Sequence, residues 1–145
     1  RLNKLNLNFN NIKNSGDYII LSEPSKVIKK FYNLDNWVEQ TIKIINSVSD
    51  RKIIIHNKFS KEPLDYLLKN AWAFVSHQST AGFKAMLKGV PAYFTDPTLE
   101  HIGKLDDIEK HEINYSIFNN LAYGQWKLDE MKSGEAWATM SKYHK

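Results

Sequence analysis

The sequence predicts an α/β fold: a Rossmann-like, doubly wound parallel sheet of about four strands, followed by a helical C-terminal segment. Four apolar runs alternate with helical patterns, at residues 18–21, 53–55, 71–75 and 91–94. Unbroken apolar runs of this kind are typical of strands buried on both faces of a parallel sheet. The 145 residues suffice for one domain with a hydrophobic core and are few for two, so we expect a single domain over 1–145.

The first 16 residues are predicted to be a polar N-terminal extension that is rich in asparagine. Its apolar side chains permit either a short strand or a tail that packs on a neighbour outside this sequence: Leu2, Leu5, Leu7 and Phe9. A cluster of turn-forming residues at 14–17 separates the extension from the first strand.

Two helical patterns follow the first strand. Three apolar residues predict at least one helical turn: Val27, Phe31 and Tyr32. Asp35 then suits the N-cap of a longer helix, which ends at Ser49 and Asp50. Apolar side chains and one threonine recur there at helical spacing: Trp37, Val38, Thr41, Ile42, Ile44, Ile45 and Val48.

The second strand, residues 53–55, is predicted to be as buried as the first. Residues 63–70 then predict a short helix with Leu64, Leu67 and Leu68 facing inward.

Residues 71–94 are the most informative part of the chain. An apolar run gives way to small polar residues from Ser76, and a helical pattern begins near Ser79. That helix ends at Gly89, and Pro91 opens the next apolar run. The segment is therefore predicted to be one βαβ unit with polar side chains at the carboxyl end of its first strand.

Residues 105–145 are predicted to form the C-terminal helical segment. A turn is expected at 105–108 and a helix from Ile117, which Gly124 interrupts. Residues 128–140 continue as a separate terminal helix.

Composition excludes several classes of protein. Without cysteine there is no disulfide framework, thiolate metal site or cysteine nucleophile, which fits a cytoplasmic protein. No apolar run approaches the length of a membrane span, and the polar start lacks the apolar region of a signal peptide. Because the chain begins at Arg1, we leave open that upstream residues are missing. The histidines lack the spacing of a metal motif, so no metal is assigned: His56, His77, His101, His111 and His144.

The net charge of +4 is spread along the chain. No basic stripe interleaved with aromatic residues is visible, so we expect no nucleic-acid partner. The charge is typical of a solvated surface that also suits an anionic ligand.

Polar side chains follow each predicted strand, and in a parallel sheet these strand ends share one edge. Hydroxyl, imidazole and ammonium donors suited to phosphate are Ser76, His77, Ser79, Thr80, His56 and Lys58. Carboxylates that could accept from sugar hydroxyls are Asp96 and Glu100, and candidates for a general base, by location alone, are Glu23 and Asp96.

Each of these residues also has a structural interpretation. Ser79 and Thr80 could equally well serve as helix caps without any ligand. Lys58 taken alone is typical of a solvated surface. Asp96 precedes a proline, which is mostly a turn signal. The chain carries neither a dinucleotide-binding nor a P-loop glycine motif.

The run from residue 18 to about residue 96 resembles the C-terminal, donor-binding half of GT-B glycosyltransferases. It is most similar to the capsular-polysaccharide type, which includes Kdo- and sialic-acid-transferring enzymes and phage and environmental relatives. In that type a strand ends in His-Pro or Lys-Pro, and the next ends in a Ser/Thr-rich elbow whose helix closes with Gly-x-Pro. Here the first element corresponds to residues 53–58 and the second to residues 76–91, although Asn57 and Phe59 stand where a His-Pro or Lys-Pro version would have proline.

The resemblance implies that His56, Ser79 and Thr80 bind the phosphate of a nucleotide-activated sugar, often a CMP-sugar, without metal or other cofactor. The implied reaction is transfer of the sugar to a hydroxyl acceptor such as a glycan or lipid-linked glycan. A GT-B enzyme takes its acceptor site from a second domain, for which this chain has no room, so we expect an incomplete enzyme that needs such a domain or a homo-oligomer. The alternative is a catalytically silent Rossmann-like binding or assembly module, such as one encoded by a phage.

Overall fold

The structure, a computed structural model, describes residues 1–5 and 12–142. These residues pack into two compact units. One contains residues 12–114, and the other contains residues 1–5 together with 115–142. The first unit holds the sheet and the candidate site.

A four-stranded, all-parallel sheet forms the centre of the first unit, which confirms the predicted fold class. Its strands are β1 (Tyr18–Ser22), β2 (Lys52–His56), β3 (Ala71–Ser76) and β4 (Ala92–Phe94). They lie in the order β2-β1-β3-β4, so β1 and β3 are central. Every residue of β3 is buried, as its unbroken apolar sequence predicts.

Helices connect the strands and follow the sheet. The α-helices are α1 (Lys26–Phe31), α2 (Trp37–Val48), α3 (Leu64–Leu67), α4 (Thr80–Leu87), α5 (Ile117–Tyr123), α6 (Leu128–Lys132) and α7 (Glu135–Met140). The 3-10 helices are η1 (Asn3–Leu5), η2 (Leu68–Asn70), η3 (Pro97–Ile102) and η4 (Leu105–Asp107). Among the described residues, no helix is both long and apolar enough to cross a membrane.

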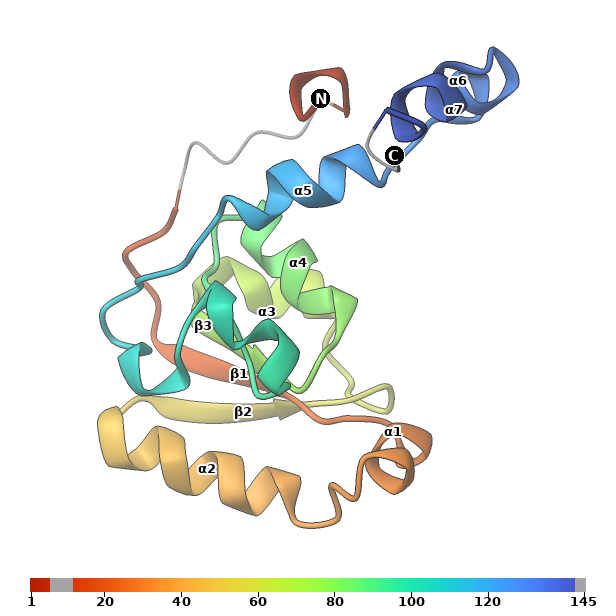
Figure 1. The fold of residues 1–145 in the computed structure, drawn as a ribbon. Helices are drawn as coiled ribbons and strands as arrows, with labels where there is room; N and C mark the ends of the chain where they lie inside the picture. Colours follow the sequence, from red (N-terminus) through yellow and green to blue (C-terminus); the bar gives the residue numbers. More distant parts are fainter. Residues whose placement is uncertain (6–11, 143–145) are drawn as a thin grey trace. The chain divides into compact units, whose positions relative to one another are not determined.

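Alternate residues of the strands face opposite sides of the sheet, and both sides are covered. Ile19 and Val75 belong to the side that packs against Trp37 and Ile45 of α2. The other side meets α3 and α4, as Figure 1 shows. There the Tyr18 hydroxyl donates to the carbonyl of Leu67 at 2.8 Å. The two layers make the sheet doubly wound.

Helix α4 is fixed by its ends and by one small residue. The Ser79 hydroxyl caps its start, and Gly89, with φ +80°, follows its end in the left-handed conformation that favours glycine. Within the helix, a Cβ on Gly82 would lie 2.6 Å from Cζ of Phe94. Only glycine therefore lets α4 approach β4 this closely.

Two predictions for the first unit are wrong in detail. Strand β2 is not buried on both faces: it is an edge strand, and Ile55 is 45% exposed. The N-cap of α2 is Asn36 rather than Asp35, and its side chain makes no capping hydrogen bond. Trp37 and its packing on the sheet set the start of this helix instead.

The second unit holds the last three helices. Gly124 ends α5, as predicted. The predicted terminal helix over 128–140 is two helices, because Gly134 adopts φ +80° between them. The guanidinium of Arg1 binds both carboxylate oxygens of the buried Glu130 at 2.6 and 2.8 Å. Of the predicted N-terminal strand or tail, Leu7 and Phe9 lie outside the described residues, and Asn3–Leu5 is a 3-10 turn.

Candidate functional site

The order of the strands creates a crevice between β1 and β3. After β1 the chain passes through α1 and α2 to β2, on one side of β1. After β3 it passes through α4 to β4, on the opposite side. The two connections diverge at the carboxyl ends of β1 and β3, which is where open parallel sheets bind ligands.

A pocket of about 340 Å³ occupies this crevice. Its walls come only from the segments that follow β1 and β3: Ser22, Glu23, Pro24, Ser25, Ile28, Ser76, His77, Gln78, Ser79 and Thr80. We call it the switch-point pocket. It brings together Glu23, Ser76, His77, Ser79 and Thr80, all of which the sequence singles out.

Two buried polar atoms of the pocket wall lack hydrogen-bond partners. Oγ of Ser76 and Nε2 of His77 are shielded from solvent, and neither makes a hydrogen bond among the described residues. Ser76 is 1% exposed and His77 is 7% exposed. A buried polar group without a partner costs about 1–3 kcal/mol, so natural proteins leave few of them without a reason.

The other nitrogen of His77 is held by a chain of side chains. The indole N–H of Trp37 donates to Oγ1 of Thr95 at 2.7 Å, and that oxygen lies 3.0 Å from Nδ1 of His77. Because indole can only donate, the single hydroxyl proton of Thr95 is free to point at Nδ1. In the neutral imidazole this arrangement places the proton on Nε2, which makes Nε2 a donor.

The start of α4 contributes fewer donors than its position suggests. The N–H of Ala81 donates to Oγ of Ser79 at 3.2 Å, and the N–H of Gly82 donates to the Ser79 carbonyl at 2.9 Å. Ser79 therefore acts as a helix cap here. Its hydroxyl can still donate its own proton toward the pocket, and Thr80 is exposed beside it.

Glu23 supplies the acidic group of the pocket. Its carboxylate is paired with Lys29 of α1, and the Asn57 side-chain amide donates to its Oε2 at 3.0 Å. These hydrogen bonds, from Lys29 first and Asn57 second, hold the pKa of Glu23 below its usual value. The group is thus an ionised acceptor whose charge is balanced locally.

His56 and Lys58 do not line the switch-point pocket. His56 ends β2, on the side of β1 away from β3, and its carbonyl accepts from the backbone N–H of Glu23 at 2.9 Å. Lys58 is exposed, with Nζ 4.9 Å from the centre of the Phe59 ring. Asn57, which lies between them, is the residue of this loop that reaches Glu23.

Asp96 lies near the pocket, whereas Glu100 lies elsewhere. The Asp96 carboxylate caps η3 by accepting from the backbone and hydroxyl of Thr98, which lowers its pKa. Its Oδ2 is 3.9 Å from Nε2 of His77. Glu100 is exposed and lines a separate hollow with His101.

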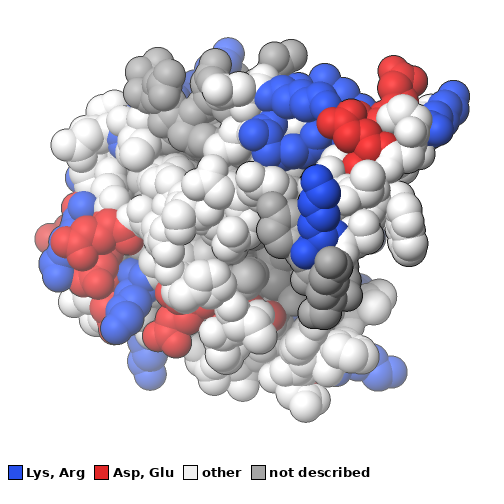
Figure 2. All heavy atoms as spheres, turned by 45° about the horizontal axis from the view of Figure 1, so that its top comes forward, with Lys and Arg blue, Asp and Glu red and all other residues white. Residues whose placement is uncertain are grey.

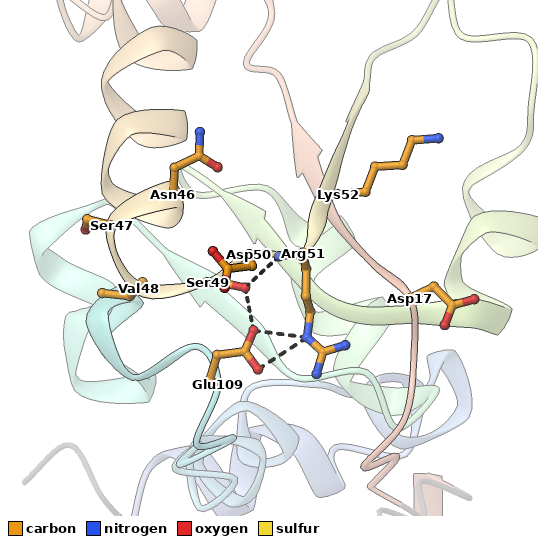
Figure 3. A pocket seen from close by; sticks show the side chains of 9 residues that line it. All are labelled: Asp17, Asn46, Ser47, Val48, Ser49, Asp50, Arg51, Lys52 and Glu109. Carbon is orange, nitrogen blue, oxygen red and sulfur yellow. Dashed lines mark hydrogen bonds and ion pairs between the residues drawn. The ribbon is translucent and has the colours of Figure 1, made fainter.

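A larger hollow, of about 730 Å³, lies at the other end of the strands. Figure 3 shows Arg51 and Glu109 pointing toward one another within it. Arg51 also donates to the Gly16 carbonyl at 2.8 Å and stacks over Trp72, 3.6 Å from the ring centre. Because Arg51 and Glu109 already bind each other, we interpret this open hollow as a structural junction despite its size.

Charged side chains are interspersed on the face drawn in Figure 2, where basic and acidic groups lie next to one another. Ion pairs of this kind include Lys88 with Asp65 at 3.0 Å and Lys110 with Asp107 at 2.7 Å. The positive net charge is therefore not gathered into a single basic stripe on that face.

Sequence reasoning missed several residues of the site, among them Ile28, Gln78, Lys29 and Asn57. Ile28 and Gln78 line the pocket, while Lys29 and Asn57 hold Glu23 in place. Gln78 could have been found, because it lies within the polar run after β3. Lys29 could not, since only the fold shows which lysine of α1 turns toward Glu23.

Comparisons with known proteins identify no family for this chain: no family model, curated protein or solved structure matches it. Among the described residues, no cluster of three or more histidine or acidic side chains could hold a metal ion. The site must therefore be interpreted from its own chemistry.

Proposed function

We propose that the switch-point pocket binds the sugar-phosphate part of a nucleotide-activated sugar, with a CMP-sugar favoured. The observation that carries this proposal is a pair of buried polar atoms without hydrogen bonds at the carboxyl end of β3, Ser76 Oγ and His77 Nε2. Both lie in residues that line a pocket at the switch point of the sheet. Because consecutive strand residues face opposite sides of the sheet, a ligand would reach the two atoms with different oxygens, and each hydrogen bond would remove a desolvation cost.

The distribution of donors and acceptors supports this class of ligand. Ser76, His77 and Ser79 offer donors on the β3 side, where a phosphate would lie. Glu23, on the β1 side, offers an ionised acceptor suited to sugar or ribose hydroxyls. Among the described residues, no lysine or arginine lines the pocket, which favours a phosphate carrying a neutral, hydroxyl-rich group over a highly charged polyphosphate.

The volume sets a further limit on the ligand. Ligand pockets span roughly 300–1,000 Å³, and this one, at about 340 Å³, is at the lower end. It suits a phosphate with about one attached ring, and the remainder of a nucleotide sugar would extend past its mouth.

Binding without transfer is the second candidate, and one observation favours it. A general base works best with a pKa near the working pH, yet the pKa values of both candidate carboxylates, Glu23 and Asp96, are lowered. We therefore assign no base. If the chain takes part in transfer, its donors would stabilise the charge that develops on the leaving phosphate.

Calorimetric titration and thermal-shift measurements with CMP-, UDP- and GDP-sugars test the binding proposal. A ligand at about 100 times its Kd should stabilise the protein by about 2.7 kcal/mol. Ser76→Ala and His77→Phe should each weaken binding by about 1–3 kcal/mol. Asn46→Ala with Lys52→Ala, in the hollow at the opposite end of the strands, is the matched control and should bind as the parent does. Failure of every nucleotide sugar to bind would refute the proposal.

A product assay on the same samples separates an enzyme from a binding module. We expect binding without transfer, because the lowered pKa values of Glu23 and Asp96 suit neither carboxylate to the role of general base. Transfer that is linear in protein concentration and survives dilution would contradict this expectation.

A further inference from the structure

Helix α1 is attached to the protein by one side only. Ile28 lines the switch-point pocket and Lys29 pairs with Glu23, so these two residues face the body of the unit. No residue of the helix is buried. The side chains of the opposite face are therefore available for contact with something other than this chain.

That opposite face combines lysines with large apolar side chains. Val27 and Phe31, one helical turn apart, are each 76% exposed. Lys26 and Lys30, also one turn apart, are exposed on the same side. A soluble surface gains nothing from exposing two such apolar groups side by side, so the face needs an explanation.

The loop after β2, at residues 57–60, also exposes a lysine beside a large apolar side chain. Phe59 is 80% exposed, and the ammonium of Lys58 lies 4.9 Å from the centre of its ring. The loop and the helix are anchored to one carboxylate, because Glu23 binds both Asn57 of the loop and Lys29 of the helix. Figure 1 shows the loop that follows β2 near α1.

We propose that this basic-apolar rim, defined by Lys26, Val27, Lys30, Phe31, Lys58 and Phe59, binds the surface of an anionic lipid bilayer. Exposed phenylalanine and valine insert into the interfacial region, and the lysines around them meet anionic headgroups. A protein partner is the less favoured occupant, because lysine is depleted in protein interfaces and half of the rim residues are lysines. The charge of the rim therefore selects the bilayer. This proposal does not depend on nucleotide binding.

Cosedimentation of the full chain with lipid vesicles tests the proposal. The protein should bind vesicles that contain phosphatidylglycerol, bind phosphatidylcholine vesicles weakly, and dissociate as salt rises from about 0.15 M to 1 M. Val27→Ser with Phe31→Ser and Phe59→Ser should reduce binding at least tenfold. Lys26→Glu with Lys30→Glu should reduce it more strongly, since each lysine near such a surface contributes about a fivefold gain in binding.

Two control variants lie outside the rim. Leu128→Ser with Trp137→Ser removes apolar groups that are 65% and 74% exposed on other helices. Lys104→Glu with Lys132→Glu makes the same change in net charge as the rim variant. Both controls should bind like the parent. The proposal is overturned if the parent binds no vesicles, if the controls lose as much as the rim variants, or if the rim variants retain parental binding. It is also overturned if the rim instead mediates self-association, seen as a concentration-dependent mass that the rim variants abolish.

Discussion

The indole N–H of Trp37 donates to the hydroxyl of Thr95 at 2.7 Å, across 58 residues of sequence. Trp37 begins α2 on one side of the sheet, and Thr95 follows β4 at the carboxyl ends of the strands. The backbone N–H of Thr95 also donates to the Ser76 carbonyl at 3.0 Å. One tryptophan thus connects the packing of the core to the position of the pocket wall.

Trp37→Phe should lower the stability of the protein and change the balance between the two tautomers of His77. Losing the indole donor should cost about 1–3 kcal/mol in urea unfolding, because the partly buried Thr95 oxygen loses a partner. The imidazole ¹⁵N shifts should change from one dominant tautomer to a mixture, since the Thr95 hydroxyl is no longer oriented. Trp72→Phe, which removes a comparable bond to the Ile108 carbonyl at 3.1 Å, should lower stability without altering the His77 shifts. Equal effects of both variants on the shifts would count against the chain of hydrogen bonds.

Ser79→Ala should destabilise the protein by about 1 kcal/mol, because α4 loses its N-cap. Ser79→Asp should restore most of that loss, since its carboxylate can accept from the same N–H groups. Ser25→Ala removes the corresponding cap of α1, a helix without buried residues, and should have a smaller effect on global unfolding. A Ser79→Ala variant with parental stability would show that the cap contributes nothing.

Gly82→Ala should destabilise the fold by about 1–3 kcal/mol, because the new methyl would lie 2.6 Å from the Phe94 ring. Combining it with Phe94→Leu should recover part of the loss, so the double-mutant cycle should show coupling. Gly124→Ala is the control: its nearest neighbour atom would be 3.5 Å away, an ordinary contact. Denaturant midpoints of the parent, the two single variants and the double variant, compared with that of Gly124→Ala, decide whether the close approach of α4 and β4 is required.

Stability should fall as the pH drops below about 6.5, and His111 should account for part of the fall. In the folded protein the pKa of His111 lies below its ordinary value, mainly because the side chain is buried and also because the Arg51 charge is close. The unfolded chain therefore takes up the proton first, and the stabilisation present above that pH is lost as the pH falls through the lowered pKa. His111→Phe should flatten this part of the stability curve and retain the stacking on Trp72, whose ring centre is 3.9 Å away. An unchanged slope would exclude His111 as the titrating group.

The sequence predicts the sheet well because β3 and its neighbours carry unbroken apolar runs between clear turn signals. It predicts the start and end of α4 equally well, since Ser79 and Gly89 are specific signals for a cap and a stop. It fails for Ile55, because an edge strand and a central strand can share the same apolar pattern. Which strand lies at the edge depends on the order of pairing, which composition does not encode.

Part of the candidate site was predictable because it follows from the parallel strands alone. Placing polar side chains at strand ends requires only that the strands be parallel, and Ser76, His77 and Ser79 follow from that. Excluding His56 and Lys58 from the pocket requires knowing that β2 lies on the far side of β1 from β3. The role of Asn57 depends on a side-chain contact with Glu23 that no spacing rule anticipates.

The order of the strands also governs how the sheet can assemble. Strand β1 is central, and Ile19 pairs with Ile53 on one side and with Ala73 on the other. Both partners come much later in the chain, so β1 leaves the ribosome well before its two neighbours and waits for them. Such non-local pairings slow folding and keep an apolar strand exposed in the meantime. We therefore expect the nascent chain to be most vulnerable to aggregation, and most dependent on chaperones, until β3 has emerged.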